Sequence, residues 1–189
     1  VKYHGVALHV DDVKWAEKQM WAPDANEKDG KYSLFFPAKD YKGIFRIGVA
    51  IGENPQGPFT PMDKPIEGSF SIDPTVYKDE NGEYYMYFGG LWGGQLQRWR
   101  TGVFNAENAA SPTAFIPNDD EPALLPFVAK MSDDLLEFAE KPREVQILDE
   151  KGNLLLAGDN ERRFFEAAWV HKYNGKYYFS YSTGDTHFI

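Results

Sequence analysis

Three residues whose side chains could share one chemical task occupy equivalent positions in three similar segments of the chain. Trp21, Asp73 and Glu166 each stand nine residues before a turn glycine, namely Gly30, Gly82 or Gly175. If the three segments pack around a common axis, one aromatic ring and two carboxylates converge. Two neighbouring carboxylates are suited to proton transfer, because the charge of one raises the pKa of the other. The sequence therefore predicts an acid–base site at Asp73 and Glu166.

Glu166 has the surroundings expected of a proton donor. Its sequence neighbours are mostly apolar: Phe164, Phe165, Ala167, Ala168 and Trp169. Burial in such a strand favours the neutral, protonated carboxyl. The alternative is an edge-strand carboxylate that pairs with Arg162 or Arg163, since ion pairs also explain many such residues. For Asp73 the alternative is a turn-forming Asp-Pro dipeptide.

The elements that position these residues are expected to be β-hairpins. Residues 70–90 read as strand, turn and strand, since an Asn-Gly turn between apolar runs is a strong hairpin signal. Residues 21–36 and 164–182 repeat the design. Residues 44–50 alternate as a further strand, residues 100–126 lack periodicity, and no helix longer than about two turns is expected. Repeated small sheets predict an all-β chain with about three blades of a β-propeller.

Composition narrows the classes of partner. The chain has 189 residues, enough for one domain, and a net charge of −9, which argues against a nucleic-acid partner. It contains no cysteine, so thiolate nucleophiles, disulfides and Cys-based zinc sites are excluded. No apolar run reaches membrane-spanning length, so no membrane partner is expected. A neutral ligand such as a sugar is compatible with this charge and composition.

Several short motifs resemble glycoside hydrolase family 43, and they occur in the family's order along nearly the whole chain. They are MWAPD at 20–24, IGVA at 47–50, NPQGPF at 54–59, SIDP at 71–74 and FEA at 165–167. The resemblance implies a five-bladed propeller, of which this piece lacks the first and last blades. Residues 1–189 are thus expected to form a single catalytic domain truncated at both ends, unstable and inactive when isolated.

The resemblance also implies a reaction: inverting hydrolysis of β-xylosidic or α-L-arabinofuranosidic bonds in xylan or arabinoxylan oligosaccharides and polysaccharides. Glu166 matches the family's general acid and Asp73 the residue that tunes its pKa and orients it. The family's general base, an Asp of the first blade, is expected upstream of Val1, and its metal-associated histidine beyond Ile189. The residues present require no cofactor and suggest no metal site; a structural calcium in the intact parent is left open. Compartment and oligomeric state are not predicted.

Four residues are candidates for substrate binding: Trp21, Trp92, Gln95 and His187. A tryptophan can stack on a sugar ring, and an amide can both donate to and accept from sugar hydroxyls. Gln97 is expected beside Gln95 in the same glycine-rich loop. The alternatives are a core role for Trp21, a plain connection between blades for the loop, and a structural or solvated imidazole for His187. Asp24 is expected to serve as a hydrogen-bonding residue of the structure.

Two other functions compete with this interpretation. Invertase- and fructanase-like propellers typically carry Arg-Asp-Pro and Glu-Cys, whereas this chain has Ile-Asp-Pro and Glu-Ala, which disfavours them. A non-catalytic glycan-binding propeller is the alternative from a different class, because propellers host many functions.

Overall fold

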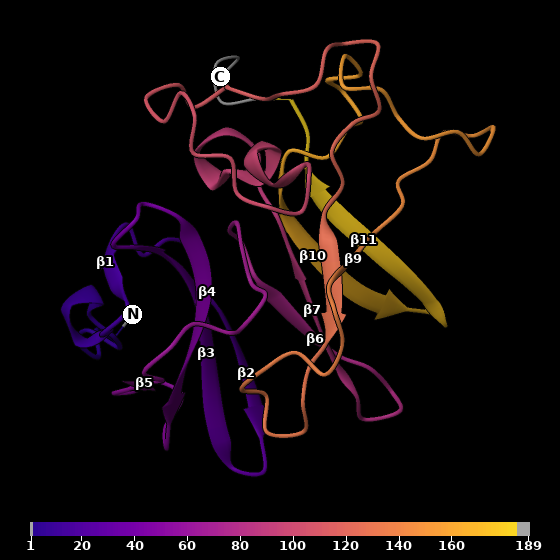
Figure 1. The fold of residues 1–189 in the computed structure, drawn as a ribbon. Helices are drawn as coiled ribbons and strands as arrows, with labels where there is room; N and C mark the ends of the chain where they lie inside the picture. The colour runs from indigo at the N-terminus through magenta and orange to yellow at the C-terminus, as the bar shows by residue number, and fades with distance from the viewer. Residues whose placement is uncertain (1, 185–189) are drawn as a thin grey trace.

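The computed structural model describes residues 2–184, which form three antiparallel sheets and a few 3₁₀ turns (Figure 1). The first sheet has the strand order β1-β3-β4-β5, with β2 also paired to β3. Its strands are β1 (Ala16–Lys18), β2 (Asp24–Lys28), β3 (Lys31–Asp40), β4 (Phe45–Gly52) and β5 (Thr60–Pro61). The second sheet contains β6 (Thr75–Lys78), β7 (Tyr84–Phe88), β8 (Phe127–Lys130) and β9 (Arg143–Glu144) in that order. The third contains β10 (Glu166–Tyr173) and β11 (Lys176–Ser182).

The three predicted hairpins are confirmed as β2–β3, β6–β7 and β10–β11. Their turns explain the recurring glycines. In the first and third hairpins both central turn residues have positive φ, at Asp29-Gly30 and Asn174-Gly175. This is the type I′ geometry that matches the twist of paired strands and that Asn, Asp and Gly adopt most easily. The predicted strand at 44–50 is also present, as β4.

The segment around Arg98 does not form the strand that its residue pattern suggests. The alternation of Arg98 and Arg100 about Trp99 suggests a strand, but the structure has the 3₁₀ helices η2 (Trp92–Gly94) and η3 (Leu96–Trp99) here. Gln95 between them has a φ of 67°, which a continuous strand cannot include. The remaining 3₁₀ helix, η1 (Val10–Asp12), lies near the N-terminus.

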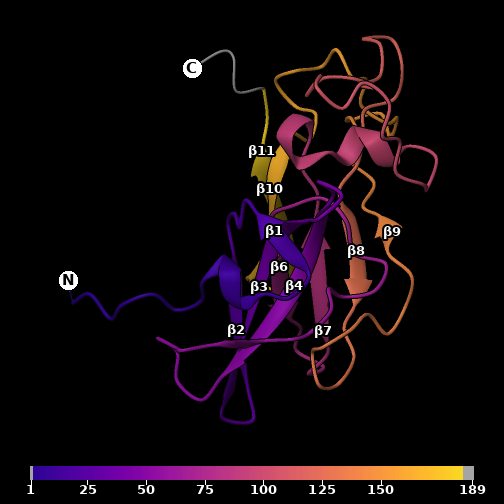
Figure 2. The same cartoon turned by 60° about the vertical axis from the view of Figure 1, so that its left-hand side comes forward.

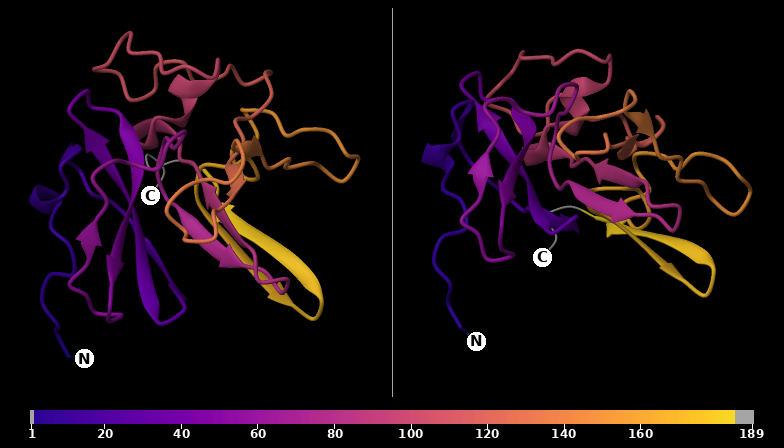
Figure 3. Two further views of the ribbon diagram at one scale, coloured as in Figure 1. Left: turned by 60° about the horizontal axis from the view of Figure 1, so that its bottom comes forward. Right: turned by 90° about the horizontal axis from the view of Figure 1, so that it is seen from below.

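Apolar side chains join the sheets into one body. Phe35, Ile47 and Val49 of the first sheet pack with Met86 and Phe88 of the second in one buried cluster. A smaller cluster of Leu96, Phe164 and Ala168 joins the η3 turn to the third sheet. Figure 3 shows the three sheets side by side in chain order and splayed apart, whereas in Figure 2 the first sheet comes forward and partly covers the other two. The all-β prediction is confirmed, and no sheet closes on itself within residues 2–184.

The third sheet exposes an unusual amount of aromatic surface. Trp169 is 52% exposed, and the exposed tyrosines of its two strands are Tyr173, Tyr177 and Tyr178. The ring of His171 stacks on Tyr178 with a centroid distance of 5.2 Å.

None of the helices in the described part of the chain has the length and apolar character needed to cross a bilayer.

Candidate active site

The first strands of the three hairpins begin at the same end of the molecule. At that end, the backbone N–H of Ala167, in β10, donates to Oδ2 of Asp73, two residues before β6, at 3.0 Å. At the other end the hydroxyl of Tyr177, in β11, donates to Asp79, just after β6, at 2.6 Å. β6 and the β10–β11 hairpin therefore lie alongside each other from the site to the turns. The structure brings Asp73 and Glu166 together, as their shared register predicts.

A β-bulge at the start of β10 sets the direction of these groups. Glu166 pairs with Ser182 and Trp169 with Ser180, so three steps on β10 face two on β11. Ala167, inside the bulge, has a φ of 59°, and Asp73 has a φ of 53°. Bulges locally bend a strand and redirect its groups. Here the bulge turns the Ala167 N–H out of the ladder and toward the Asp73 carboxylate.

The electrostatics of the pair favour a proton on Glu166. Both carboxylates are partly buried. Burial raises the pKa of Glu166, and the negative charge of Asp73 raises it further. Burial also raises the pKa of Asp73, but the hydrogen bond from Ala167 opposes this shift. The hydrogen bond thus stabilises the charged form of Asp73, and that charge in turn stabilises the protonated form of Glu166. Arg162, considered from sequence as a partner of Glu166, instead pairs with Asp159 and Glu150.

Two supporting residues beneath the pair are missed by sequence reasoning. Ser71 is fully buried with a φ of 64°; its hydroxyl accepts from the Gly90 N–H at 2.9 Å and donates to the Gly94 carbonyl at 2.8 Å. A Cβ on Gly90 would lie 2.5 Å from the Ile72 side chain and 3.4 Å from Cβ of Glu166. The absence of a side chain at Gly90 thus permits close packing of Ile72 and Glu166 beneath the site. The position of Ser71 directly before Ile-Asp-Pro was the available signal.

Trp21 and Trp92 both lie next to Gly93. The Trp92 ring meets the ring of Phe165 edge-on, with centroids 5.7 Å apart. Phe165 is the residue before Glu166. A Cβ on Gly93 would lie 3.1 Å from the Trp21 ring, which also packs on Phe45 at 4.6 Å. Trp21 is 37% exposed and so is not a core residue. Aromatic faces beside two carboxylates form a surface on which a sugar ring can stack.

The two candidate glutamines have different roles. Gln95 joins the sheets: its amide accepts from the Phe45 N–H and donates to the Gly43 carbonyl, both at 2.9 Å. Its contact with sugar stays a prediction. Gln97 is fully buried and bonded to backbone groups, so the expectation that it lines a sugar subsite is wrong. His187 lies outside the described residues.

Asp24 and Asn26 fix the start of β6 from the neighbouring sheet. Oδ2 of Asp24 accepts from the Val76 N–H, and Nδ2 of Asn26 donates to the Val76 carbonyl, each at 2.7 Å. Two side chains of β2 therefore take the place of a paired strand beside Val76. The predicted hydrogen-bonding role of Asp24 agrees with this geometry, and the contact holds β6 close behind Asp73.

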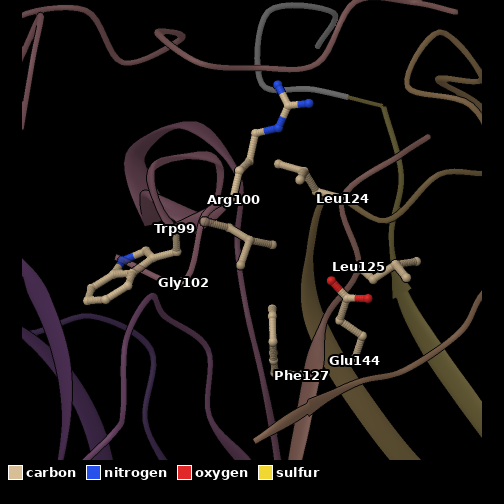
Figure 4. A pocket seen from close by; sticks show the side chains of 8 residues that line it. Trp99, Arg100, Gly102, Leu124, Leu125, Phe127 and Glu144 are labelled. Carbon is tan, nitrogen blue, oxygen red and sulfur yellow. The ribbon is translucent and has the colours of Figure 1, made fainter. Parts of the chain in front are cut away.

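A cavity of about 290 Å³ lies behind the η3 turn (Figure 4). It is lined by Leu96, Trp99, Arg100, Gly102, Leu124, Leu125, Phe127 and Glu144, a set that does not include the two carboxylates. The candidate site is therefore defined by its chemistry and lies apart from this cavity. Within residues 2–184, no cluster of three or more His, Cys, Asp or Glu side chains is arranged to hold a metal ion.

Comparison with known proteins places this geometry in a family. The family described as "Glycosyl hydrolases family 43" matches residues 3–110. A xylosidase/arabinosidase of Bacteroides ovatus is 57% identical over 189 residues, which cover 100% of this chain and 56% of that protein. Xylosidase/arabinosidase 43A of Humicola insolens is 59% identical over 98% of this chain and 57% of its own length.

Solved structures give the same result. CoXyl43, a β-xylosidase/α-arabinofuranosidase from a compost metagenome solved with xylotriose, matches with a TM-score of 0.91 and 63% identity over 97% of this chain and 55% of that one. The β-xylosidase RS223 matches with a TM-score of 0.89 and 58% identity, over 97% of this chain and 55% of its own. The chain spans about half the length of these relatives. These matches, together with the sequence motifs and the paired carboxylates, show that the chain belongs to glycoside hydrolase family 43.

Proposed function

We propose that the protein containing this chain hydrolyses β-xylosidic or α-L-arabinofuranosidic bonds in xylan or arabinoxylan, with inversion at the anomeric carbon. The observation that carries the proposal is the pairing of Glu166 with Asp73 across the Ala167 hydrogen bond. The similarity to proteins named as xylosidases and arabinosidases supports the substrate class. In the whole protein, the three sheets are proposed to form part of a five-bladed propeller.

Glu166 is the proposed general acid. Its protonated carboxyl donates to the glycosidic oxygen as the bond from that oxygen to the anomeric carbon breaks. In an inverting reaction a water attacks the anomeric carbon from the opposite face and gives its proton to a base. We assign that base to the part of the relatives' length that this chain does not cover. The charge of Asp73 favours the protonated form of Glu166 that this step requires.

The aromatic side chains are proposed to hold the sugar. Trp21 and Trp92 supply flat faces next to Gly93, and Trp92 adjoins Phe165, the residue before Glu166. A sugar stacked there has its glycosidic oxygen within the region of the carboxylates. The Gln95 amide is a further candidate for a hydroxyl contact at the edge of this surface.

The test uses the full-length protein with Glu166→Ala and Asp73→Ala, assayed on aryl β-xylosides and aryl α-L-arabinofuranosides. Loss of a general acid lowers the rate by roughly 10²–10⁴-fold, so we expect turnover to fall in that range for Glu166→Ala and to fall clearly for Asp73→Ala. Glu161→Ala, which removes an exposed carboxylate five residues before Glu166, is the matched control and should keep wild-type turnover.

Unchanged turnover in either site variant would overturn the assignment. A wild-type protein that binds xylan fragments and never releases reducing sugar would instead establish the non-catalytic alternative. The anomeric form of the first product, followed by NMR, separates inversion from retention.

A further inference from the structure

Trp92 has a backbone conformation that its own side chain does not favour. Its φ is 54°, in the left-handed region that large side chains rarely adopt. Such a conformation persists only where surrounding contacts determine it. The next residues form a 3₁₀ turn, and Gln95 after that turn is also left-handed, with a φ of 67°. The orientation of the Trp92 ring therefore depends on whatever holds this turn.

One buried side chain bonds both backbone groups of Trp92. Oε1 of Gln97 accepts from the Trp92 N–H at 2.9 Å, and Nε2 donates to the Trp92 carbonyl at 3.1 Å. Both backbone groups of Trp92 are thus bonded to one amide, much as a paired strand would bond them. Gln97 is completely buried, and its Nε2 also donates to the Pro112 carbonyl at 2.8 Å. The amide therefore joins Trp92 to the long irregular segment that follows.

The adjacent residue fixes that segment. Arg98 is 5% exposed, and its guanidinium donates to four backbone carbonyls at 2.8–3.0 Å. These carbonyls belong to Asn105, Glu107, Asn108 and Ser111. Gln97 and Arg98 together hold Trp92 and residues 105–112 as one unit. In Figure 1 this unit lies at the upper end of the molecule.

We propose that Gln97 is a positioning residue for the sugar on the leaving-group side of Glu166, acting through Trp92. The inference rests on the proposed function. A general acid protonates the leaving oxygen, so the wall beside it faces the departing sugar. The Leu91 N–H donates to the Phe165 carbonyl at 2.9 Å and the Trp92 ring meets the Phe165 ring, so Trp92 lies next to the start of β10, which carries Glu166, and its ring is assigned to that wall. Gln97 contacts no substrate itself; it fixes the ring on which the leaving sugar stacks.

The test compares two substrates in the full-length protein carrying Gln97→Glu. This variant keeps the shape and the acceptor for the Trp92 N–H, but it loses both Nε2 bonds and places a carboxylate against the Trp92 and Pro112 carbonyls. Xylobiose has a sugar as its leaving group, whereas β-xylosyl fluoride has a single atom. We expect the KM for xylobiose to rise by about tenfold, the amount expected from one lost stacking contact. The KM for the fluoride, kcat for both substrates and the pH profile should stay unchanged.

Two further variants make the test specific. In Trp92→Ala the KM for xylobiose should rise by a similar factor, and adding Gln97→Glu to it should change nothing more. Ser132→Ala is the structural control, because it removes two hydrogen bonds from a turn far from the site, to Asp134 and Glu137. It should lower the melting temperature without changing the ratio of the two KM values.

The outcomes separate the two proposals. If the wild-type protein cleaves neither these xylosides nor aryl α-L-arabinofuranosides, the proposed function fails. If the wild-type protein cleaves both but Gln97→Glu changes both KM values equally, or adds to the effect of Trp92→Ala, the role of Gln97 is refuted. Should Gln97→Glu fail to fold, Trp92→Ala alone decides, since an unchanged KM for xylobiose there removes the wall on which the inference depends.

Discussion

Oδ2 of Asp73 and the backbone nitrogen of Ala167 lie 3.0 Å apart, so a carboxylate that precedes β6 is bonded to the peptide that follows Glu166. The contact joins residues 94 positions apart in the chain. Asp73 therefore acts on Glu166 in two ways: its hydrogen bond fixes the peptide next to Glu166, and its negative charge raises the pKa of Glu166. Variants that separate position from charge therefore test the site directly.

Asp73→Asn should shift the pH dependence of the reaction. The asparagine oxygen can still accept from Ala167, but the negative charge that raises the pKa of Glu166 is gone. The pKa of Glu166 should therefore fall. The alkaline limb of kcat/KM reports loss of the acid's proton in the free enzyme, so this limb should move to lower pH. Asp73→Ala removes both effects and should also lower kcat at the optimum; an alkaline limb that stays in place in both variants would contradict the coupling.

Glu166→Gln should stabilise the folded protein at neutral pH. The pKa of Glu166 is raised on folding, so ionising it costs stability as the pH rises from the unfolded-state pKa through the folded-state pKa. Glutamine avoids that cost, and the melting temperature should exceed that of the wild type at pH 7. The difference should vanish below about pH 4, where an ordinary glutamate is protonated in both states. The exposed variant Glu161→Gln provides the baseline at both pH values; equal melting temperatures at pH 7 for Glu166→Gln and wild type would contradict the shift.

Gly90→Ala should disturb the site by steric overlap. The added Cβ would lie 2.5 Å from Cγ1 of Ile72, the residue before Asp73. Overpacking of this kind costs about 1–3 kcal/mol of folding stability, and displacement of Ile72 should also lower kcat/KM. Denaturant unfolding and kinetics measure the two effects. Gly82→Ala, in an open turn at the far end, should lose stability through its positive φ alone and keep its activity.

The overlap can be tested by restoring the space. Combining Gly90→Ala with Ile72→Ala should cost less than the sum of the two single changes, because residues in contact are not additive. Strict additivity would show that the glycine serves another purpose.

The contact between Asp24 and Val76 should depend on an acceptor and not on a charge. Asp24→Ala leaves the buried Val76 N–H without its 2.7 Å partner, which costs about 1–3 kcal/mol. Asp24→Asn keeps an oxygen acceptor and removes a carboxylate whose pKa is raised by burial, so it should be at least as stable as the wild type at pH 7. Denaturant unfolding of both variants measures the difference. Equal destabilisation by Ala and Asn would mean that the charge matters after all.

The hairpins and the meeting of Asp73 with Glu166 could be predicted because each depends on local signals. A type I′ turn needs positive φ at both central residues, and the Asn-Gly dipeptide of the third hairpin indicates such a turn in the sequence. Counting back from such a turn gives the position of each strand residue. Two residues at equal distances from their turns then lie at the same end of neighbouring hairpins.

The supports of the site could not be predicted in the same way. Gln97 and Arg98 are polar yet buried, and their side-chain N–H groups donate to backbone carbonyls of an irregular segment. No periodic pattern in the sequence predicts the path of that segment. The alternation of Arg98 and Arg100 about Trp99 suggests a strand, although the chain forms a 3₁₀ turn there. Ser71 is likewise small and unremarkable in sequence. Its importance comes from contacts 19 and 23 residues away.

The irregular pairing at the start of β10 limits how the family can vary in length. Glu166 and Trp169 stand opposite Ser182 and Ser180, which point to one side of β11, so deleting Ala167 or Ala168 would restore an even ladder and leave Glu166 on its present side. The deletion would, however, remove the left-handed peptide at Ala167 whose N–H bonds Asp73. Insertions and deletions between Glu166 and Trp169 should therefore be absent from every active member.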